Sequence, residues 1–378
     1  MQRKMPSKAL SLQKPFQEEW IRKDASRPHI LPVFLPHLGC PERCVFCNQK
    51  AVAQVMPTPS FVEAFVERSV KTFPTSRPRR ERQVAFYGGS FTAIAPKDQR
   101  RYLESVRPAL LSGQIDSIRI STRPDSLDHE ALDLLQDHGV RTIEIGAQSM
   151  VDRVLSLSQR GHTSQDTTLA VSRLRERGFE VGLHLMLGLP GEGEEDFLHT
   201  LNRTIELRPD FVRIHPTLIL RGTRLETLWR QGDYLPLSLE ETVRWLEGAL
   251  LRFEEARIRV VRVGLQPTAE IEAHYLAGPY HPALRELVEG ELFFHMAKEL
   301  LERSHGTFDA AFSCHPRAVS KLRGQRNGNI DRLKALVGLR SICVRPEKEL
   351  EEDVLVLRTE RSLESIQKQD LLKHGNLG

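Results

Sequence analysis

The sequence lacks any stretch of about eighteen consecutive apolar residues, which a membrane-spanning helix would need. Its first residues carry positive charges, but the apolar segment that follows such charges in a secretory signal is missing as well. These two absences predict a cytoplasmic protein without a membrane partner. A strong net charge of one sign is also absent, because the sequence has 54 Lys and Arg and 50 Asp and Glu. The net charge of +4 is therefore too small to establish a nucleic-acid partner and only mildly favours an anionic one.

Cysteine is scarce, with five residues in the chain. An odd number does not suit a disulfide framework, and three of the cysteines, Cys40, Cys44 and Cys47, fall within eight residues. This spacing predicts thiolates that bind metal in a reducing compartment. Cys314 and Cys343 stand alone, as small buried cysteines often do, and we assign them no role.

The chain alternates short β-rich runs with amphipathic helical stretches from about residue 28 onward. Residues 1–27 precede this pattern and predict a loosely ordered basic arm. The expected strands cover residues 30–35, 84–87, 118–121, 142–146, 181–187 and 211–216. The expected helices cover residues 60–72, 97–111, 127–138, 164–177, 194–207 and 239–255.

Strands joined by helical crossovers imply a parallel sheet. Six such units predict an α/β fold in which residues 28–267 form a partial (β/α)6 barrel of the TIM type. A doubly wound sheet is the alternative, because periodicity does not separate the two closures. Residues 268–378 predict a smaller α+β extension. Its expected parts are a helix over 282–302, a basic stretch over 317–334 and a short β-like pair at 341–344 and 354–357. A seventh β-like run, at 259–265, precedes the extension.

The three clustered cysteines lie in the loop that follows the first expected strand, Cys40-Pro-Glu-Arg-Cys44-Val-Phe-Cys47. Three thiolates at this spacing can hold three irons of a 4Fe-4S cluster and leave the fourth iron without a protein ligand. S-adenosylmethionine (SAM) can chelate that iron, and one electron from the cluster then cleaves SAM to a 5'-deoxyadenosyl radical. The loop therefore predicts a radical SAM enzyme, which needs an electron donor such as a ferredoxin or flavodoxin.

A structural zinc site is the alternative for the same loop. Structural zinc takes four protein ligands, and Cys314-His315 or Cys343 would have to supply a distant fourth. Phe46, just before the third cysteine, offers a flat face to an adenine ring, although a lone aromatic more often packs in a core.

Polar and glycine-containing turns follow the other expected strands, at the barrel rim where enzymes of this fold class assemble their sites. Gly88-Gly89 follows the second strand and lets the backbone approach a ligand closely. Arg160 suits a bidentate pair with the SAM carboxylate, or it is a solvated surface charge. The remaining turns are Ser121-Thr-Arg-Pro-Asp125, Gly146-Ala-Gln148, His184-Leu-Met-Leu-Gly188-Leu-Pro-Gly191 and His215-Pro-Thr217.

Over residues 28–265 the motifs resemble the radical SAM half of the Elongator catalytic subunit. The shared elements are the cysteine loop, Gly88-Gly89, Arg123-Pro-Asp125, Arg160-Gly-His-Thr163, Gly188-Leu-Pro-Gly191 and the run from His215 to Tyr234. More distantly, the chain is similar to oxygen-independent coproporphyrinogen III oxidase. The resemblance implies SAM contacts at Phe34, Gly88, Gly89, Gln148, Arg160 and His184.

Three departures from these families limit what the resemblance implies. Ser121 stands where a glutamate usually binds SAM, so that contact is weakened or made elsewhere. Residues 268–378 contain no Gly-rich turn of the kind that binds acetyl-CoA, so acetyl transfer is not implied. Asn48 replaces the extra cysteine of coproporphyrinogen oxidase, which argues against porphyrin decarboxylation.

Two functions remain open at this point. The leading hypothesis is an Elongator-like radical SAM enzyme without an acetyltransferase domain, with RNA as a candidate substrate and no DNA expected. The second is a non-enzymatic iron–sulfur or haem-carrier accessory protein. RNA is suggested by basic groups that could bind phosphates, although such runs are usually solvated. These groups are Arg77, Arg79, Arg80 and Arg82, and Arg317, Lys321, Arg323, Arg326, Arg332 and Lys334.

Overall fold

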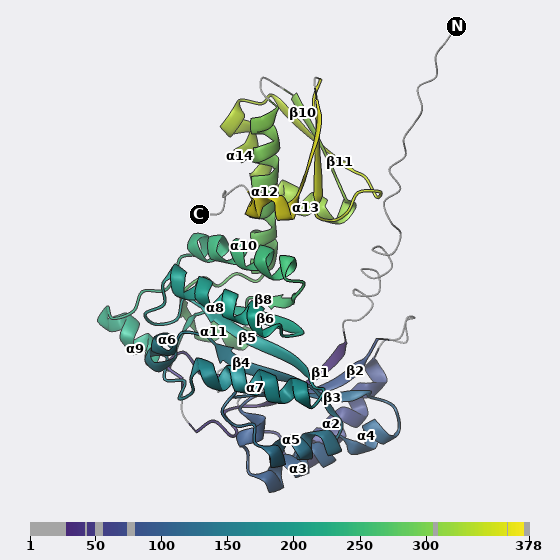
Figure 1. Cartoon of the computed structure of the whole chain (residues 1–378), viewed down its shortest axis with the longest axis vertical. Helices are drawn as coiled ribbons and strands as arrows, with labels where there is room; N and C mark the ends of the chain where they lie inside the picture. Colours follow the sequence, from purple (N-terminus) through teal and green to yellow (C-terminus); the bar gives the residue numbers. More distant parts are fainter. Residues whose placement is uncertain are drawn as a thin grey trace.

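A parallel sheet of seven strands forms the larger part of the protein (Figure 1). The computed structural model describes residues 28–41, 44–49, 56–73, 80–304, 309–360 and 362–373, so the predicted arm at 1–27 lies outside the described residues. The strands are β1 (His29–Leu35), β2 (Arg82–Gly88), β3 (Ser117–Thr122), β4 (Val140–Gln148), β5 (Glu180–Leu187), β6 (Phe211–Pro216) and β8 (Arg259–Val263).

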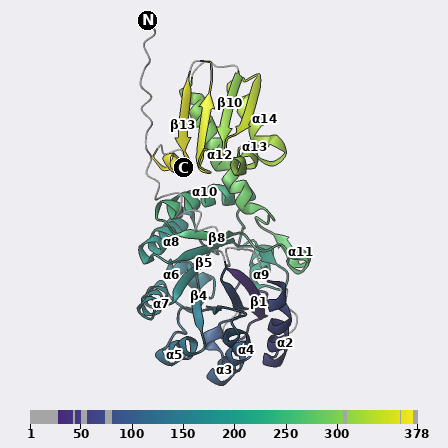
Figure 2. The same cartoon turned by 90° about the vertical axis from the view of Figure 1, so that its right-hand side faces the viewer.

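The strands of this sheet pair in the order β1-β2-β3-β4-β5-β6-β8, and every pair is parallel. This order contains no reversal, which excludes the doubly wound alternative. β1 and β8 are the two edges of the sheet, so the curled sheet is an open half-barrel (Figure 2). The predicted partial barrel is confirmed, and the β-like run at 259–265 supplies its seventh strand.

Helices cover the outer face of the half-barrel, as Figures 1 and 2 show. One helix that the sequence predicts over 97–111 is divided, because Pro108 has no N–H to continue a helix and its ring crowds the preceding turn. The helices that accompany the sheet are α2 (Pro59–Ser69), α3 (Pro96–Glu104), α4 (Arg107–Leu111), α5 (His129–Asp137), α6 (Asp152–Leu157), α7 (Ser164–Glu176), α8 (Glu194–Leu207), α9 (Arg224–Gln231) and α10 (Leu239–Glu255).

The strands separate apolar from polar side chains because successive residues of a strand point to opposite faces. The residues that face the helices are apolar and almost fully buried, as Val84, Ile118 and Ile143 illustrate. Their neighbours face the concave side and include Tyr87 and Glu144. The core of the half-barrel therefore lies between sheet and helices, and the concave face is left for polar groups.

The C-terminal part forms a second sheet, with the order β11-β10-β12-β13 and its own hydrophobic cluster. The two β-like runs that the sequence predicts as a pair are β11 and β12, and β10 lies between them. Leu251 of α10 belongs to this second cluster. The strands are β10 (Asp309–Cys314), β11 (Ser341–Pro346), β12 (Val354–Arg358) and β13 (Leu363–Gln367); the helices are α12 (Leu284–Arg303), α13 (Val319–Arg323) and α14 (Gly328–Val337).

A short two-stranded sheet connects the two parts near the carboxyl ends of the barrel strands. It pairs β7 (Ile219–Leu220) with β9 (Tyr275–Ala277), and α11 (Ala269–His274) lies between them in sequence. None of the described helices has the length and apolar character that crossing a membrane requires.

Candidate functional site

The cysteine loop is fixed by backbone hydrogen bonds to segments far away in sequence. The N–H of Val45 donates to the carbonyl of Ser158 at 3.2 Å, and the N–H of Leu225 donates to the carbonyl of Val45 at 2.8 Å. Ser158 ends α6 and Leu225 lies in the first turn of α9. The loop is therefore held between α6, which follows β4, and α9, which follows β6 and β7 in sequence.

The Gly88-Gly89 turn and the cysteine loop touch backbone to backbone. The N–H of Gly89 donates to the carbonyl of Leu35 at 2.9 Å, and a Cβ on Gly89 would lie 2.0 Å from the carbonyl oxygen of Leu38. A Cβ on Gly39 would lie 2.2 Å from the carbonyl oxygen of Ser90. Both glycines are required by this close approach, which sets the path of the loop before its first cysteine.

The chemistry of the three cysteines fits a cluster better than a single zinc ion. Ligand sulfurs on one zinc lie about 3.8 Å apart, given Zn–S bonds of about 2.3 Å in a tetrahedron. Among the described residues, the atoms that gather within 4.8 Å of one another as possible ligands of one ion are those of Glu247, Glu291 and His295, and the three cysteines are not a group of this kind. Cys314 is buried in the C-terminal cluster and Cys343 is exposed, so neither is a fourth ligand in this loop.

Burial governs the protonation of the thiols. It raises the pKa of Cys40 and raises that of Cys47 to about 12, with the neighbouring cysteines adding to both shifts. Arg160 opposes these shifts through its positive charge. Buried thiols of this kind are neutral at pH 7 and lose their protons when iron binds, which couples cluster assembly to proton release.

Arg160 links the cysteine loop to the end of β4. Its guanidinium donates to the sulfur of Cys44 at 3.0 Å and to the carbonyl of Gly146 at 2.7 Å. Its Nε is buried without a partner, and so is the Oε1 of Gln148 nearby. Gln148 has a φ of 68°, a conformation that costs a non-glycine residue free energy and is common at binding sites. Orphaned donors and acceptors beside the cysteine loop are what a bound polar cofactor would satisfy.

His184 lies on the concave face, where its ring pairs with that of His215. Its Nε2 shares a hydrogen bond of 2.9 Å with the Nδ1 of His215, and the ring centroids are 4.3 Å apart. Burial lowers the pKa of His184 to about 4, helped by the positive charges of Arg213 and Arg160. The pair is therefore neutral at physiological pH.

The concave face carries a polar network that sequence reasoning missed. Glu144 accepts hydrogen bonds from the hydroxyl of Tyr87 at 3.0 Å and from Arg119 at 2.8 Å, and its second oxygen lies 2.7 Å from the Nε of Arg213. Burial and the charge of Glu144 raise the pKa of Tyr87 well above its usual value. The sequence indicates only that these residues share the face opposite the apolar residues, since they occupy alternate positions of four expected strands.

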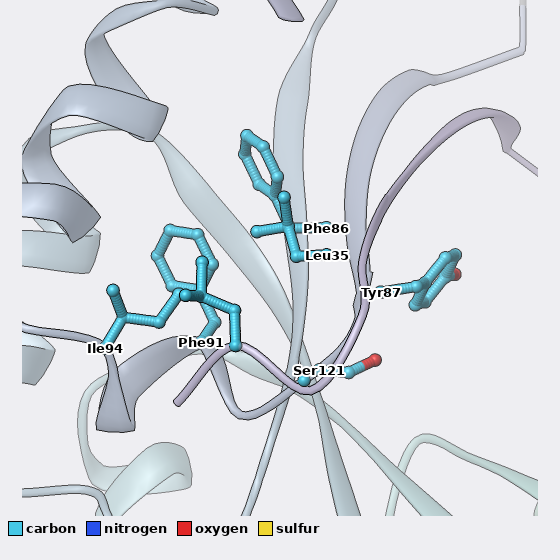
Figure 3. Close-up of a pocket in the computed structure, with 8 residues that line it drawn as sticks. Leu35, Phe86, Tyr87, Phe91, Ile94 and Ser121 are labelled. Carbon is cyan, nitrogen blue, oxygen red and sulfur yellow. The ribbon is translucent and has the colours of Figure 1, made fainter. Parts of the chain in front are cut away.

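Ser121 and Tyr87 project to the side of the sheet opposite Phe86, Phe91 and Ile94, as Figure 3 shows. The apolar residues in this view pack together on the helix-covered side of the sheet, and the space between them is too small for a water molecule. Ser121 thus faces the concave side with Tyr87.

The two aromatic candidates differ in their surroundings. Phe34 is half-buried beside Gly88, where an added Cβ would lie 3.0 Å from the Phe34 ring. Phe46 packs against two apolar clusters, one that includes Ile219 and Leu225 and one that includes Met186. Core packing therefore accounts for part of the Phe46 surface, and the ring is not fully buried.

Known proteins resemble parts of this chain in sequence. A tRNA uridine(34) acetyltransferase from Methanocaldococcus jannaschii is 33% identical over 127 residues, which is 33% of this chain and 24% of that protein. A haem chaperone from Bacillus subtilis is 24% identical over 206 residues, covering 53% of this chain and 54% of the relative. The chain thus spans a quarter to about half of these relatives.

One solved structure supports the fold. The Elp3 protein of Methanocaldococcus infernus, determined with residues 1–46 deleted, superimposes with a TM-score of 0.55 at 22% identity. The match covers 73% of this chain and 64% of that one.

Two sequence families match successive parts of the chain. The Radical SAM superfamily matches residues 34–204, and the Radical_SAM C-terminal domain matches residues 209–293. The first match begins on β1, directly before the cysteine loop, and the second begins just before β6. The chain belongs to the radical SAM superfamily.

Proposed function

We propose that the protein is a radical SAM enzyme that cleaves SAM reductively at a 4Fe-4S cluster held by Cys40, Cys44 and Cys47. The observation that carries this proposal is the contact of Arg160 with Cys44, beside buried polar atoms that lack partners. When bound, the cluster and SAM would supply one-electron chemistry that ends in a 5'-deoxyadenosyl radical. We take residues 28–267 as the catalytic unit and residues 268–378 as an extension of it.

The residues of the chain would bind and orient the cofactors. The backbone of Gly88 and Gly89 would admit the amino or carboxylate group of SAM, because no side chain intervenes. Gln148 would satisfy its buried Oε1 with a SAM donor. Arg160 would orient the cluster through Cys44 and offer its Nε to SAM. Phe34, Phe46, Ser121 and His184 are the further contact candidates, and Phe34 and Phe46 would exclude water from the site.

Anaerobic reconstitution followed by reduction with SAM tests this proposal. The wild-type chain should release 5'-deoxyadenosine under a low-potential reductant, and Cys47→Ala should release none. The same assay separates the enzyme from a haem-carrier protein, which would bind haem without cleaving SAM. A correctly folded, iron-loaded wild-type chain that yields no 5'-deoxyadenosine with any reductant would contradict the proposal.

RNA is the substrate class that we propose for this enzyme. A relative that acts on uridine of tRNA supports it. The basic stretch at 317–334 supports it less than its sequence suggests, because three of its six basic side chains pair with carboxylates, namely Arg317 with Glu352, Lys321 with Glu289 and Arg332 with Glu291. Arg80 and Arg82 of the first basic group are described, whereas Arg77 and Arg79 lie outside the described residues.

Of the three remaining basic side chains, Arg323 and Arg326 lie at the connection of α13 to α14, and Lys334 lies in the last turn of α14. Arg323 donates to the neutral side chain of Asn327 at 3.3 Å, and neither Arg326 nor Lys334 forms an ion pair within the described part of the chain. Gln325 in the same connection lies 3.4 Å from His281, close to the segment that follows β9. An RNA backbone that contacts Arg323 and Arg326 would therefore pass beside the rim of the half-barrel.

A further inference from the structure

Arginines outnumber carboxylates in a charged network that extends from β3 to the β6–β8 edge of the sheet. Arg119 and Arg213 share the carboxylate of Glu144, with Nη1 of Arg119 at 2.8 Å and Nε of Arg213 at 2.7 Å. The next carboxylate, Glu180, is paired with Arg259 at 3.0 Å and lies 3.9 Å from Arg119. These two carboxylates are thus already committed to three guanidinium groups.

Arg262 adds a fourth guanidinium to this edge. It lies on β8 in register with Arg213 of β6, so both side chains face the concave side. Its Nε donates to the carbonyl of Gly264 at 3.1 Å, and no carboxylate of the described residues pairs with it. Burial lowers its pKa, and the positive charge of Arg213 lowers it further. Within the described residues, Arg262 is thus a half-buried cation without a carboxylate partner, next to a second cation that is already paired with Glu144.

His215 lies at the same edge with an unused nitrogen. Its Nδ1 is engaged by His184 at 2.9 Å, whereas its Nε2 is buried and has no partner. When His184 donates this hydrogen bond, the Nε2 of His215 carries the proton and becomes a donor. Arg213 and Arg262 are the charged groups whose fields act on this ring.

A half-buried cation without a counter-charge is costly, and a buried donor without an acceptor adds to that cost. An oxyanion would offset both costs, because its oxygens accept from guanidinium and imidazole N–H groups together. Arg213, His215 and Arg262 are each half-buried, so part of each side chain remains accessible to solvent.

We propose that Arg262 and His215, with the charge of Arg213 beside them, form a subsite for an oxyanion of the substrate, a phosphate or a carboxylate. This inference rests on the proposed function, because the oxyanion would be a group of that enzyme's substrate. It places the anionic group at the β6–β8 edge of the half-barrel, at the opposite edge from Phe34 on β1. A phosphodiester of RNA satisfies this chemistry, and so does a small carboxylic acid.

Isothermal titration of the anaerobically reconstituted full-length protein tests the subsite without SAM. Inorganic phosphate and acetate are titrated separately at constant ionic strength, with chloride as the reference anion. At least one of the two should bind saturably. Arg262→Gln should weaken that binding about tenfold or more, because it removes a charge-assisted hydrogen bond. His215→Asn should weaken it as well.

Arg141→Gln is the matched control, because Arg141 lies on β4 of the same sheet and its side chain is 64% exposed. This change removes the same charge and should leave the affinity unchanged. Arg262→Lys retains the charge and should bind the anion more tightly than Arg262→Gln does, which keeps the test valid if the Gln variant folds poorly. The comparison of phosphate with acetate identifies the class of anion.

Absence of saturable binding by both anions, or equal weakening by Arg141→Gln and Arg262→Gln, would overturn this inference. The titration needs no SAM cleavage, so the two proposals fail separately. A chain that releases 5'-deoxyadenosine but binds neither anion refutes the subsite alone. A chain that binds phosphate through Arg262 but releases no 5'-deoxyadenosine refutes the proposed function.

Discussion

The guanidinium of Arg160 donates to the sulfur of Cys44 at 3.0 Å while it also donates to the carbonyl of Gly146 at 2.7 Å. One side chain thus couples a cysteine of the loop to the end of β4, across 116 positions of sequence. The planar fork of arginine allows both bonds at once, which the single ammonium of lysine does not reproduce.

Arg160→Lys should therefore shift the reduction potential of the reconstituted cluster to more negative values. A hydrogen bond to a ligand sulfur stabilises the reduced, more negative cluster, and this variant loses or lengthens that bond. Redox titration followed by EPR measures the change. Arg153→Lys, an exposed arginine of α6 that pairs with Asp196, is the control and should leave the potential unaltered. An unchanged potential in Arg160→Lys would show that the contact is not retained around the cluster.

Cys44→Ala should abolish cluster binding and leave most of the fold intact, because the core of the half-barrel lies between sheet and helices. We expect about four irons per wild-type chain, an EPR spectrum that changes with SAM, and almost no iron in the variant. Iron analysis and far-UV circular dichroism give the two readings. Wholesale unfolding of the variant would instead indicate a metal that is needed for folding.

Gly89→Ala should disturb the cysteine loop, since its Cβ would lie 2.0 Å from the carbonyl oxygen of Leu38. The backbone must move apart, so we expect iron content to fall and the chain to lose roughly 1 to 3 kcal/mol of stability. Gly248→Ala is the control, because this helical glycine of α10 has nothing within 4 Å of its Cβ position. The Gly248→Ala variant should keep its full iron content, and its free energy of unfolding should rise by about 0.5–1 kcal/mol.

Arg323→Glu combined with Arg326→Glu should weaken RNA binding about equally across sequences and flatten its salt dependence, because phosphate contacts release counterions and read no bases. Filter binding over a range of salt concentrations measures both effects. Arg141→Glu combined with Arg203→Glu makes the same charge change on the barrel and should have a smaller effect. If the two double variants behave alike, the connection of α13 to α14 is not a docking site.

Glu192 predicts a pH dependence of stability. Burial raises the pKa of its carboxyl from 4.5 to about 8, although the N–H groups of Leu189 and Gly188 donate to it. Between these two pH values the folded state binds more protons than the unfolded state, so stability falls as pH rises. Glu192→Gln stays neutral and should flatten this slope, which makes it more stable than the wild type by roughly 1 to 4 kcal/mol at pH 8. Urea unfolding of both proteins at pH 5 and pH 8 measures the difference. If their stabilities change equally between these pH values, the raised pKa of Glu192 is contradicted.

The sequence was sufficient to predict the barrel strands, because each run is rich in apolar and β-branched residues between helical stretches. It did not reveal β10, whose Ala310, Ala311 and Ser313 have little preference for a strand. That strand is stabilised by its two neighbours, β11 and β12, which is a tertiary effect.

The candidate site divides in the same way. The cysteine loop was predictable because its spacing is local, and its chemistry follows from three residues of one segment. The Glu144 network was not predicted, because its members come from four strands and meet only when the strands pair in the observed register. The pairing of His184 with His215 depends on register as well, so sequence alone could not reveal it.

The strand order of the half-barrel also bears on how the chain is synthesised. Each strand of that sheet adds beside the preceding one, so its neighbour has already left the ribosome when it emerges. The C-terminal sheet differs, since its inner strand β10 has neighbours on both sides that emerge later. Domains generally fold as units from the N-terminus during translation. The half-barrel can therefore assemble strand by strand on the nascent chain, whereas β10 must wait for β11 and β12 before the second sheet can form.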